Sequence, residues 1–111
     1  MIAADRKAAK AAYRKRQAVA GIVAVRCVAS GEIWVGRATD VDSIETRLRF
    51  GLRTNGGIHP TMQSAWNDHG DDSFSFDIVE RLEHEDLAYV RDATLKQRLA
   101  HWRATLDAQP F

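Results

Sequence analysis

The sequence predicts an α+β domain: a small three-stranded sheet, antiparallel or mixed, flanked by helices, with an added basic helix at the N-terminus. Three observations predict this fold class. Residues 21–36 read as two short strands around a turn, residues 74–82 alternate as a third strand, and the segments between and after them carry helical periodicity. A chain of 111 residues is long enough for one compact domain with one core.

The first two strands form a predicted hairpin. The turn between them, residues 29–32, is small and polar and contains a glycine, which suits a tight reversal. Both strands are rich in the β-branched residues that favour a pleated surface, namely Val23, Val25, Val28, Ile33 and Val35.

The length of that turn decides which side chains share a face of the sheet. If residues 29–32 form the loop, Cys27 lies opposite Trp34, and Val23 shares its face with Trp34. A loop one residue shorter would pair Arg26 with Trp34 and place Val23 and Trp34 on opposite faces. We predict the longer loop.

The segment after the hairpin predicts a short helix over residues 43–53. Its apolar residues recur at helical spacing, and its arginines fall on the other side. Asp42 and Glu45 fit a capping box, with Asp42 as the N-cap and Glu45 at the third helical position. One face of this helix is therefore expected to be buried.

Two further helices are predicted. Residues 60–70 begin with a proline, which favours the first helical turn, and end in a glycine. Helical spacing of apolar residues returns over residues 83–107. Residues 110–111 at the end of the chain are expected to be frayed.

The N-terminal segment is strongly basic. Residues 4–17 are rich in Ala, Lys and Arg and contain no Gly or Pro, which predicts a helix. The first 20 residues hold six basic residues and one acidic residue, whereas the remainder holds ten basic and fourteen acidic residues. A basic segment on a mildly acidic body favours an anionic partner, with nucleic acid first. The alternative is a solvated helix that only keeps the protein soluble.

Composition argues against several other classes of protein. No apolar run approaches the ~18 residues of a membrane-spanning helix, so no membrane partner is expected. Charged residues near the start argue against a secretory signal, and the cytoplasm is the expected compartment. The single cysteine, Cys27, excludes an internal disulfide and is expected to be a small buried residue. The four histidines and Cys27 do not have the spacing of a zinc site.

Short motifs follow one another in order from the hairpin onward. Residues 21–23 read Gly-Ile-Val and residues 34–36 read Trp-Val-Gly. Residues 44–48 read Ile-Glu-Thr-Arg-Leu, and residues 62–76 contain Met-Gln-Ser-Ala-Trp-Asn, then a glycine, then Phe-Ser-Phe. Together these segments resemble the GIY-YIG nuclease superfamily, which carries Gly-Ile-Tyr and Tyr-Ile-Gly on neighbouring strands. The resemblance covers about residues 20–92.

That resemblance, together with the basic composition of the N-terminal segment, predicts two units and an activity. The units are a basic N-terminal helix over residues 1–19 and a GIY-YIG-like domain over residues 20–108. The activity is phosphodiester cleavage assisted by a divalent metal, Mg²⁺ or Mn²⁺. Arg47 matches the arginine that holds the phosphate in this superfamily, although it would also suit the exposed side of a helix. The metal-binding glutamate of the superfamily falls near Arg91, which has the wrong charge.

Asp92, the next residue, is therefore the candidate metal ligand, or else a solvent-facing charge. The two motif tyrosines are replaced by Val23 and Trp34. Valine has no polar group, and tryptophan has one N–H donor and cannot act as a base. Trp34 either shapes the site or stacks on a base, or it is a core aromatic. His59, in a loop after a Gly-Gly pair, is a candidate replacement base.

Three functional hypotheses follow from these residues. The first is a divergent endonuclease. The second is a catalytically inactive domain that uses the same fold to bind nucleic acid, and the third is a protein-interaction module that docks through the N-terminal helix. DNA is expected as the nucleic acid before RNA. The expected nucleic-acid contacts outside the motifs are Lys10, Arg14, Arg49 and Arg53.

Overall fold

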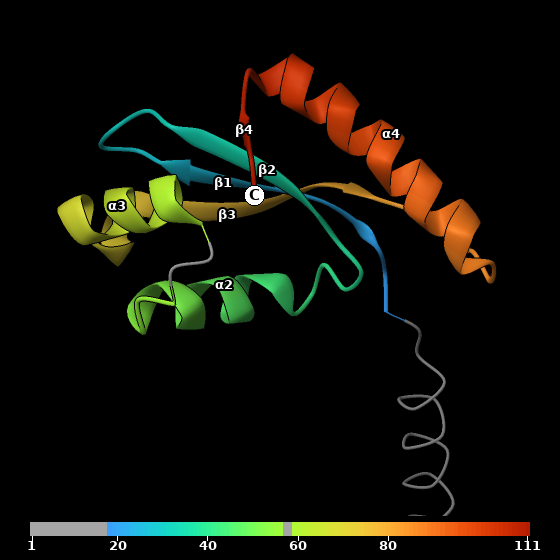
Figure 1. Ribbon diagram of the computed structural model, residues 1–111, viewed down its shortest axis with the longest axis horizontal. Helices are drawn as coiled ribbons and strands as arrows, with labels where there is room; N and C mark the ends of the chain where they lie inside the picture. Colours follow the sequence, from blue (N-terminus) through green and yellow to red (C-terminus); the bar gives the residue numbers. More distant parts are fainter. Residues whose placement is uncertain (1–17, 57–58) are drawn as a thin grey trace, which may run out of the picture.

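The described part of the chain forms one sheet of four strands in the order β3-β1-β2-β4 (Figure 1). The computed structural model describes residues 18–56 and 59–111, so the basic helix predicted at residues 4–17 lies outside the described residues. β1 pairs antiparallel with both β2 and β3, whereas β4 runs parallel to β2. The strands are β1 (Gly21–Cys27), β2 (Ile33–Ala38), β3 (Phe74–Arg81) and β4 (Gln109–Pro110).

The prediction of three strands is wrong by one, because the last residues join the sheet instead of fraying. Gln109 and Pro110 lie opposite Trp34 and Val35, and the backbone N–H of Phe111 donates to the carbonyl of Val35 at 3.2 Å. A two-residue strand is too short to show an alternating pattern, so sequence periodicity could not reveal it.

Helices cover both faces of the sheet, which confirms the α+β class. They are α2 (Ile44–Arg53), α3 (Pro60–His69) and α4 (Ala88–Leu106), with a short 3-10 turn at Asp71–Ser73. α2 and α3 lie on one face, and α4 crosses the other face (Figure 1). Within the described residues, no helix is both long enough and apolar enough to span a membrane.

The core is split by the sheet into two layers. On the α2–α3 side, Trp34 is fully buried and stacks on Phe74 with ring centroids 6.0 Å apart. Cys27 is buried in the same layer, as predicted. On the other side, the alternate strand residues pack against α4, where Leu95 is the buried helical residue. The strict alternation along β1 therefore assigns each of its side chains to one layer or the other.

The hairpin register differs from the prediction by two residues. Val25, not Cys27, lies opposite Trp34, and Val23 lies opposite Gly36. The backbone N–H of Cys27 donates to the carbonyl of Glu32 at 3.0 Å, so the loop spans residues 28–31, one position earlier than the predicted loop at residues 29–32. A shift of two residues preserves the side-chain alternation, so Val23 and Trp34 do share a face, as predicted.

The starts of two helices also differ from prediction. α4 begins at Ala88 instead of residue 83, because the Leu82 N–H still donates to the Ala20 carbonyl at 2.8 Å and continues the pairing of the sheet. The N-cap of α2 is Ser43 instead of Asp42, and no side chain caps this helix through a hydrogen bond. Glu45 pairs with Arg49 instead of closing a capping box.

Candidate functional site

Three arginines from three different elements line one cavity of about 360 Å³ between β2, α2 and α4. Arg37 lies near the end of β2, Arg47 is in the first turn of α2, and Arg91 is in the first turn of α4. We call this cavity the arginine cleft. Its lining residues are Arg37, Ala38, Thr39, Ile44, Arg47, Arg91, Asp92 and Leu95.

Local interactions position the two helix starts that carry Arg47 and Arg91. Before α2, the backbone N–H of Asp42 donates to the Asp40 carboxylate at 3.1 Å, and the N–H of buried Val41 donates to the Val19 carbonyl at 2.9 Å. Before α4, the N–H of Leu87 donates to the Glu85 carboxylate at 3.0 Å. Both helices therefore begin at the cleft, where the positive ends of their dipoles favour an anion.

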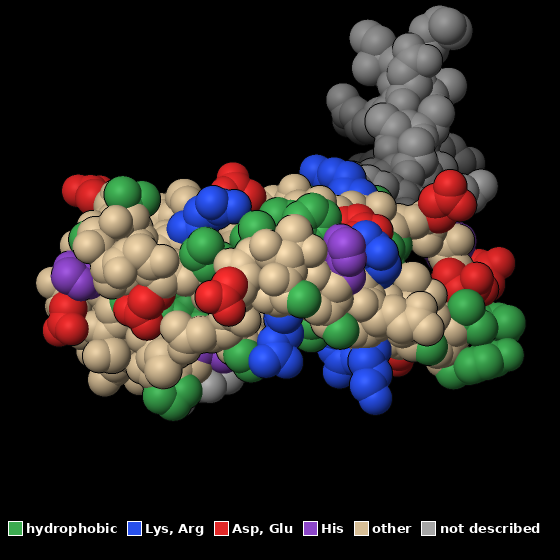
Figure 2. Space-filling model, turned by 90° about the horizontal axis from the view of Figure 1, so that it is seen from above, with side chains coloured by type: hydrophobic (Ala, Val, Ile, Leu, Met, Phe, Trp, Pro, Cys, Tyr) green, Lys and Arg blue, Asp and Glu red, His purple; other side chains and the backbone are tan. Residues whose placement is uncertain are grey.

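The cleft has an excess of positive charge. Arg91 lies 3.2 Å from the carboxylate of Asp92, so these two charges offset each other. Neither Arg37 nor Arg47 has an ion-pair partner among residues 18–56 and 59–111. On the face of the molecule seen in Figure 2, acidic and basic side chains are interspersed. Two uncompensated guanidinium groups in one cavity therefore make a local site for an anion.

The residues of the cleft do not fit a resident divalent cation. Asp92 is the one carboxylate among the described residues that line it, and its side chain is 57% exposed and engaged by Arg91. Within the described residues, no group of three or more His, Cys, Asp or Glu side chains is arranged to hold a metal. A dication would also have to enter beside three guanidinium groups, which like-charge repulsion opposes.

The two motif positions that lack tyrosine lie in the core. Val23 is 1% exposed and Trp34 is 0% exposed. The indole N–H of Trp34 donates to the Thr61 hydroxyl at 2.8 Å, so its single donor is already used. Neither residue is among those that line the arginine cleft.

His59 shares a second, small cavity with Arg47. This cavity of about 60 Å³ lies between α2 and the start of α3. The His59 ring packs edge-on against Phe111 with ring centroids 5.5 Å apart, and burial lowers the pKa of His59 below its ordinary value of 6.5. An uncharged imidazole at neutral pH can accept a proton. Arg47 thus lines the arginine cleft together with Asp92, and it lines the smaller cavity together with His59.

The remaining predicted nucleic-acid contacts divide into three cases. Lys10 and Arg14 lie outside the described residues. Arg49 donates to Glu45 at 2.9 Å and its guanidinium lies 4.5 Å from the centre of the Phe76 ring, so its charge is engaged within the domain. Arg53 is exposed near the end of α2 and does not line the arginine cleft. Contact between nucleic acid and any of these four residues stays a prediction.

Sequence reasoning missed Arg37 as a site residue and considered Arg91 only as a misfit for metal. Arg37 directly follows the Trp-Val-Gly motif, and Arg91 occupies the same position in α4 that Arg47 occupies in α2. The sequence signal that could have found these residues is a basic residue at the end of a strand, together with basic residues in the first turns of two helices. Their convergence depends on tertiary packing.

Comparison with solved structures found the same fold in the catalytic domain of the homing endonuclease I-TevI. A mutant of that domain matches with a TM-score of 0.67 and 21% identity, over 80% of this chain and 84% of that chain. A second structure of the domain matches with a TM-score of 0.66 and 21% identity, over 83% of this chain and 97% of that chain. No protein-family model and no curated protein matches the sequence. The chain therefore has the GIY-YIG fold that its motifs predict.

Proposed function

We propose that this domain binds nucleic acid, DNA in the first place, by holding phosphate groups in the arginine cleft. The observation that carries this proposal is the convergence of Arg37, Arg47 and Arg91 on one cavity. A guanidinium presents several N–H donors in a fixed plane and pairs with phosphate oxygens through two hydrogen bonds. The shared fold with an endonuclease catalytic domain supports the same partner.

The experiment is a titration of labelled DNA, single-stranded and duplex, followed by fluorescence anisotropy at low salt. Replacing Arg37 or Arg47 by Gln is expected to weaken binding about 5- to 30-fold, because each variant loses a charged hydrogen-bonded contact to phosphate. Arg103→Gln is the matched control. Arg103 is exposed in the last turn of α4 and does not line the cleft, so its loss is expected to change affinity less than about twofold.

Two results would contradict this proposal. One is the absence of salt-sensitive binding to any DNA or RNA tested, since phosphate contacts release counterions and must respond to salt. The other is binding that Arg37→Gln, Arg47→Gln and Arg103→Gln all leave unchanged. That outcome would move the interaction to another surface, such as the basic N-terminal segment.

Phosphodiester cleavage is the second candidate function. Support comes from Arg47 and Asp92, which line the same cavity, and from the fold, which is that of an endonuclease catalytic domain. The deciding assay incubates the protein with plasmid, single-stranded DNA and RNA in Mg²⁺ or Mn²⁺. Cleavage that Arg47→Ala abolishes and Arg103→Gln spares would establish this activity, whereas binding without cleavage supports the first proposal alone.

A further inference from the structure

The arginine cleft is the middle of three adjoining cavities. It shares Thr39 and Arg91 with a cavity of about 340 Å³ beside the connection from β3 to α4. It shares Arg37, Ile44 and Arg47 with a wider cavity of about 830 Å³ over α2. We call the first the His84 cavity and the second the Phe50 cavity. Neighbouring cavities thus share lining residues, and we call the three adjoining cavities together the groove.

The Phe50 cavity has aromatic and aliphatic walls next to the arginines. Phe50 on α2 is 65% exposed, and the half-buried Phe111 ring lies in the same cavity with Ile44 and Leu48. An exposed aromatic side chain beside free guanidinium groups is the combination that holds a nucleobase next to its phosphate.

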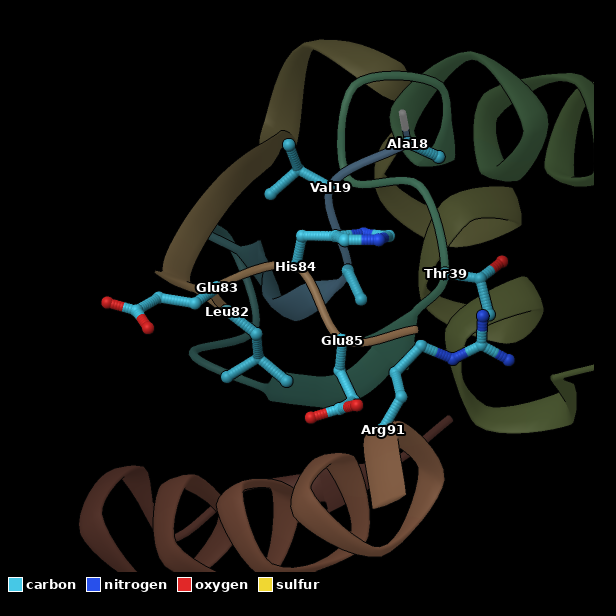
Figure 3. Close-up of a pocket in the computed structure, with 9 residues that line it drawn as sticks. Ala18, Val19, Thr39, Leu82, Glu83, His84, Glu85 and Arg91 are labelled. Carbon is cyan, nitrogen blue, oxygen red and sulfur yellow. The ribbon is translucent and has the colours of Figure 1, made fainter. Parts of the chain in front are cut away.

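The His84 cavity continues the groove on the other side of Arg91 (Figure 3). The His84 ring extends into this cavity, with Val19 and Leu82 among its walls. The Arg91 side chain rises from α4 toward Thr39, at the boundary with the arginine cleft. Glu83 and Glu85 also line this cavity, and the His84 ring nitrogen lies 2.6 Å from the Asp86 carboxylate, so this end is acidic and the cationic centre lies in the arginine cleft.

We propose that this groove holds a single strand of nucleic acid, with its phosphates at Arg37 and Arg47 and an unpaired base against Phe50. This inference rests on the proposed function and specifies its substrate class. In a duplex, each base is stacked and paired, so its face is not available to a side chain unless the strands separate. In a single strand, every base offers a free face, and stacking on an aromatic ring tolerates any sequence.

The experiment compares three labelled oligonucleotides of equal length: a thymidylate strand, the same strand with abasic sugars, and a duplex. Phe50→Ala is expected to weaken binding of the thymidylate strand about 5- to 20-fold and to leave binding of the duplex and the abasic strand within about twofold. Phe50→Trp should retain the affinity for the thymidylate strand, because its ring also stacks.

Tyr89→Ala is the matched control, because Tyr89 is a 73% exposed aromatic residue on α4 that lines none of the three cavities. It is expected to bind all three oligonucleotides like the unaltered protein. Equal thermal unfolding of the Phe50 and Tyr89 variants would show that both retain the fold.

Several outcomes would overturn this inference. They are a duplex that binds more tightly than the thymidylate strand, an abasic strand that binds as tightly as the thymidylate strand, and a Phe50→Ala effect of equal size on strand and duplex. If Arg37→Gln and Arg47→Gln still weaken binding in those cases, the proposed function survives without the preference for a single strand. If no oligonucleotide binds, both fail.

Discussion

Glu80 on β3 connects the sheet to α4 through hydrogen bonds that one of its carboxylate oxygens accepts. Its Oε1 accepts hydrogen bonds from Arg98 Nε and Trp102 Nε1, each at 2.7 Å. Desolvation by burial raises the pKa of Glu80, but the hydrogen bonds from Trp102 and Arg98 and the charge of Arg98 outweigh it, so the pKa is lowered overall from 4.5. The carboxylate form is therefore stabilised by folding.

Replacing Glu80 by Gln is expected to lower the free energy of unfolding at neutral pH by about 1–2 kcal/mol, because two hydrogen bonds lose their charged acceptor. A carboxyl group whose pKa is lowered by folding contributes stability above its unfolded pKa and loses it as pH falls through the folded pKa. The difference between the two proteins should therefore be constant above about pH 5 and shrink below the ordinary value of 4.5.

Urea unfolding across this pH range measures the difference, with Glu83→Gln as the control because Glu83 is exposed on the connection after β3. A Glu80→Gln penalty that grew on acidification would contradict the assignment, because it would mean that folding raises the pKa of Glu80. A penalty no larger than that of Glu83→Gln would show that the hydrogen bonds to Arg98 and Trp102 contribute nothing net.

At the scale of single residues, the sequence predicts which side chains are candidates for the site better than it predicts their burial and their hydrogen-bond partners. Arg47 could be selected from its motif position and Asp92 as the residue next to one, and both line one cavity. The partners of Glu80 lie 18 and 22 residues away along the chain, and no local pattern connects them. Trp34 illustrates the same limit, because burial and its hydrogen bond to Thr61 are tertiary properties.

At the scale of elements, the glycines of the two hairpin motifs mark places where the backbone has no room for a side chain. A Cβ at Gly21 would meet the backbone oxygen of Glu80 on β3. A Cβ at Gly36 would come within 2.6 Å of the Phe111 ring, just after β4. The two contacts differ in kind, because a ring at the end of a side chain can move, whereas a sheet backbone cannot do so without breaking its pairing.

This difference predicts that removing the Phe111 ring abolishes the loss of stability caused by Gly36→Ala. Gly36→Ala is expected to be destabilising because it displaces the Phe111 ring, and Phe111→Ala alone to cost about 1–3 kcal/mol, less than a fully buried phenylalanine. The double variant Gly36→Ala/Phe111→Ala should be no less stable than Phe111→Ala, giving a favourable coupling energy in a double-mutant cycle followed by denaturant unfolding.

Gly21→Ala serves as the contrast, because its clash with the β3 backbone should persist in a Phe111→Ala background. Additive effects of Gly36→Ala and Phe111→Ala would show that the ring does not occupy the space beside Gly36. In that case, β4 would not hold Phe111 against the hairpin as the structure describes.

Helix and strand patterns reveal the middle of elements more reliably than their ends. The periodicity of α2 and α3 predicts both helices within one residue at each end. The start of α4 is five residues later than predicted, because a hydrogen bond to Ala20 holds Leu82 at the sheet edge. Whether a terminal segment frays or pairs likewise depends on which edge strand is available, as β4 shows.

At the scale of the whole molecule, charge is separated along the chain. The segment from residue 21 onward holds ten basic and fourteen acidic residues, so the folded body is acidic outside its cationic cleft. The proposed attraction of nucleic acid to this body therefore depends on where the arginines converge and not on the net charge of +1. Composition could indicate an anionic partner, but only the packing of β2, α2 and α4 creates the cleft.

This charge distribution predicts that binding of nucleic acid does not need a divalent metal. The guanidinium groups already supply the positive charge, and Mg²⁺ competes with them for phosphate, so affinity in Mg²⁺ should be equal to or lower than affinity in EDTA at the same ionic strength. Asp92→Asn removes a negative charge from the cleft and is expected to leave affinity unchanged or raise it, with Asp68→Asn on α3 as the control.

Anisotropy titrations of the full chain across a range of salt concentrations measure these effects. Each of Arg37→Gln and Arg47→Gln should reduce the slope of log affinity against log salt by about 1, because one phosphate contact is lost. Binding that tightens about tenfold in Mg²⁺ and loses that gain in Asp92→Asn would contradict this account, because it would mean that Asp92 holds a metal when nucleic acid enters. The sign of the Asp92→Asn effect therefore distinguishes an arginine site for phosphate from a metal site.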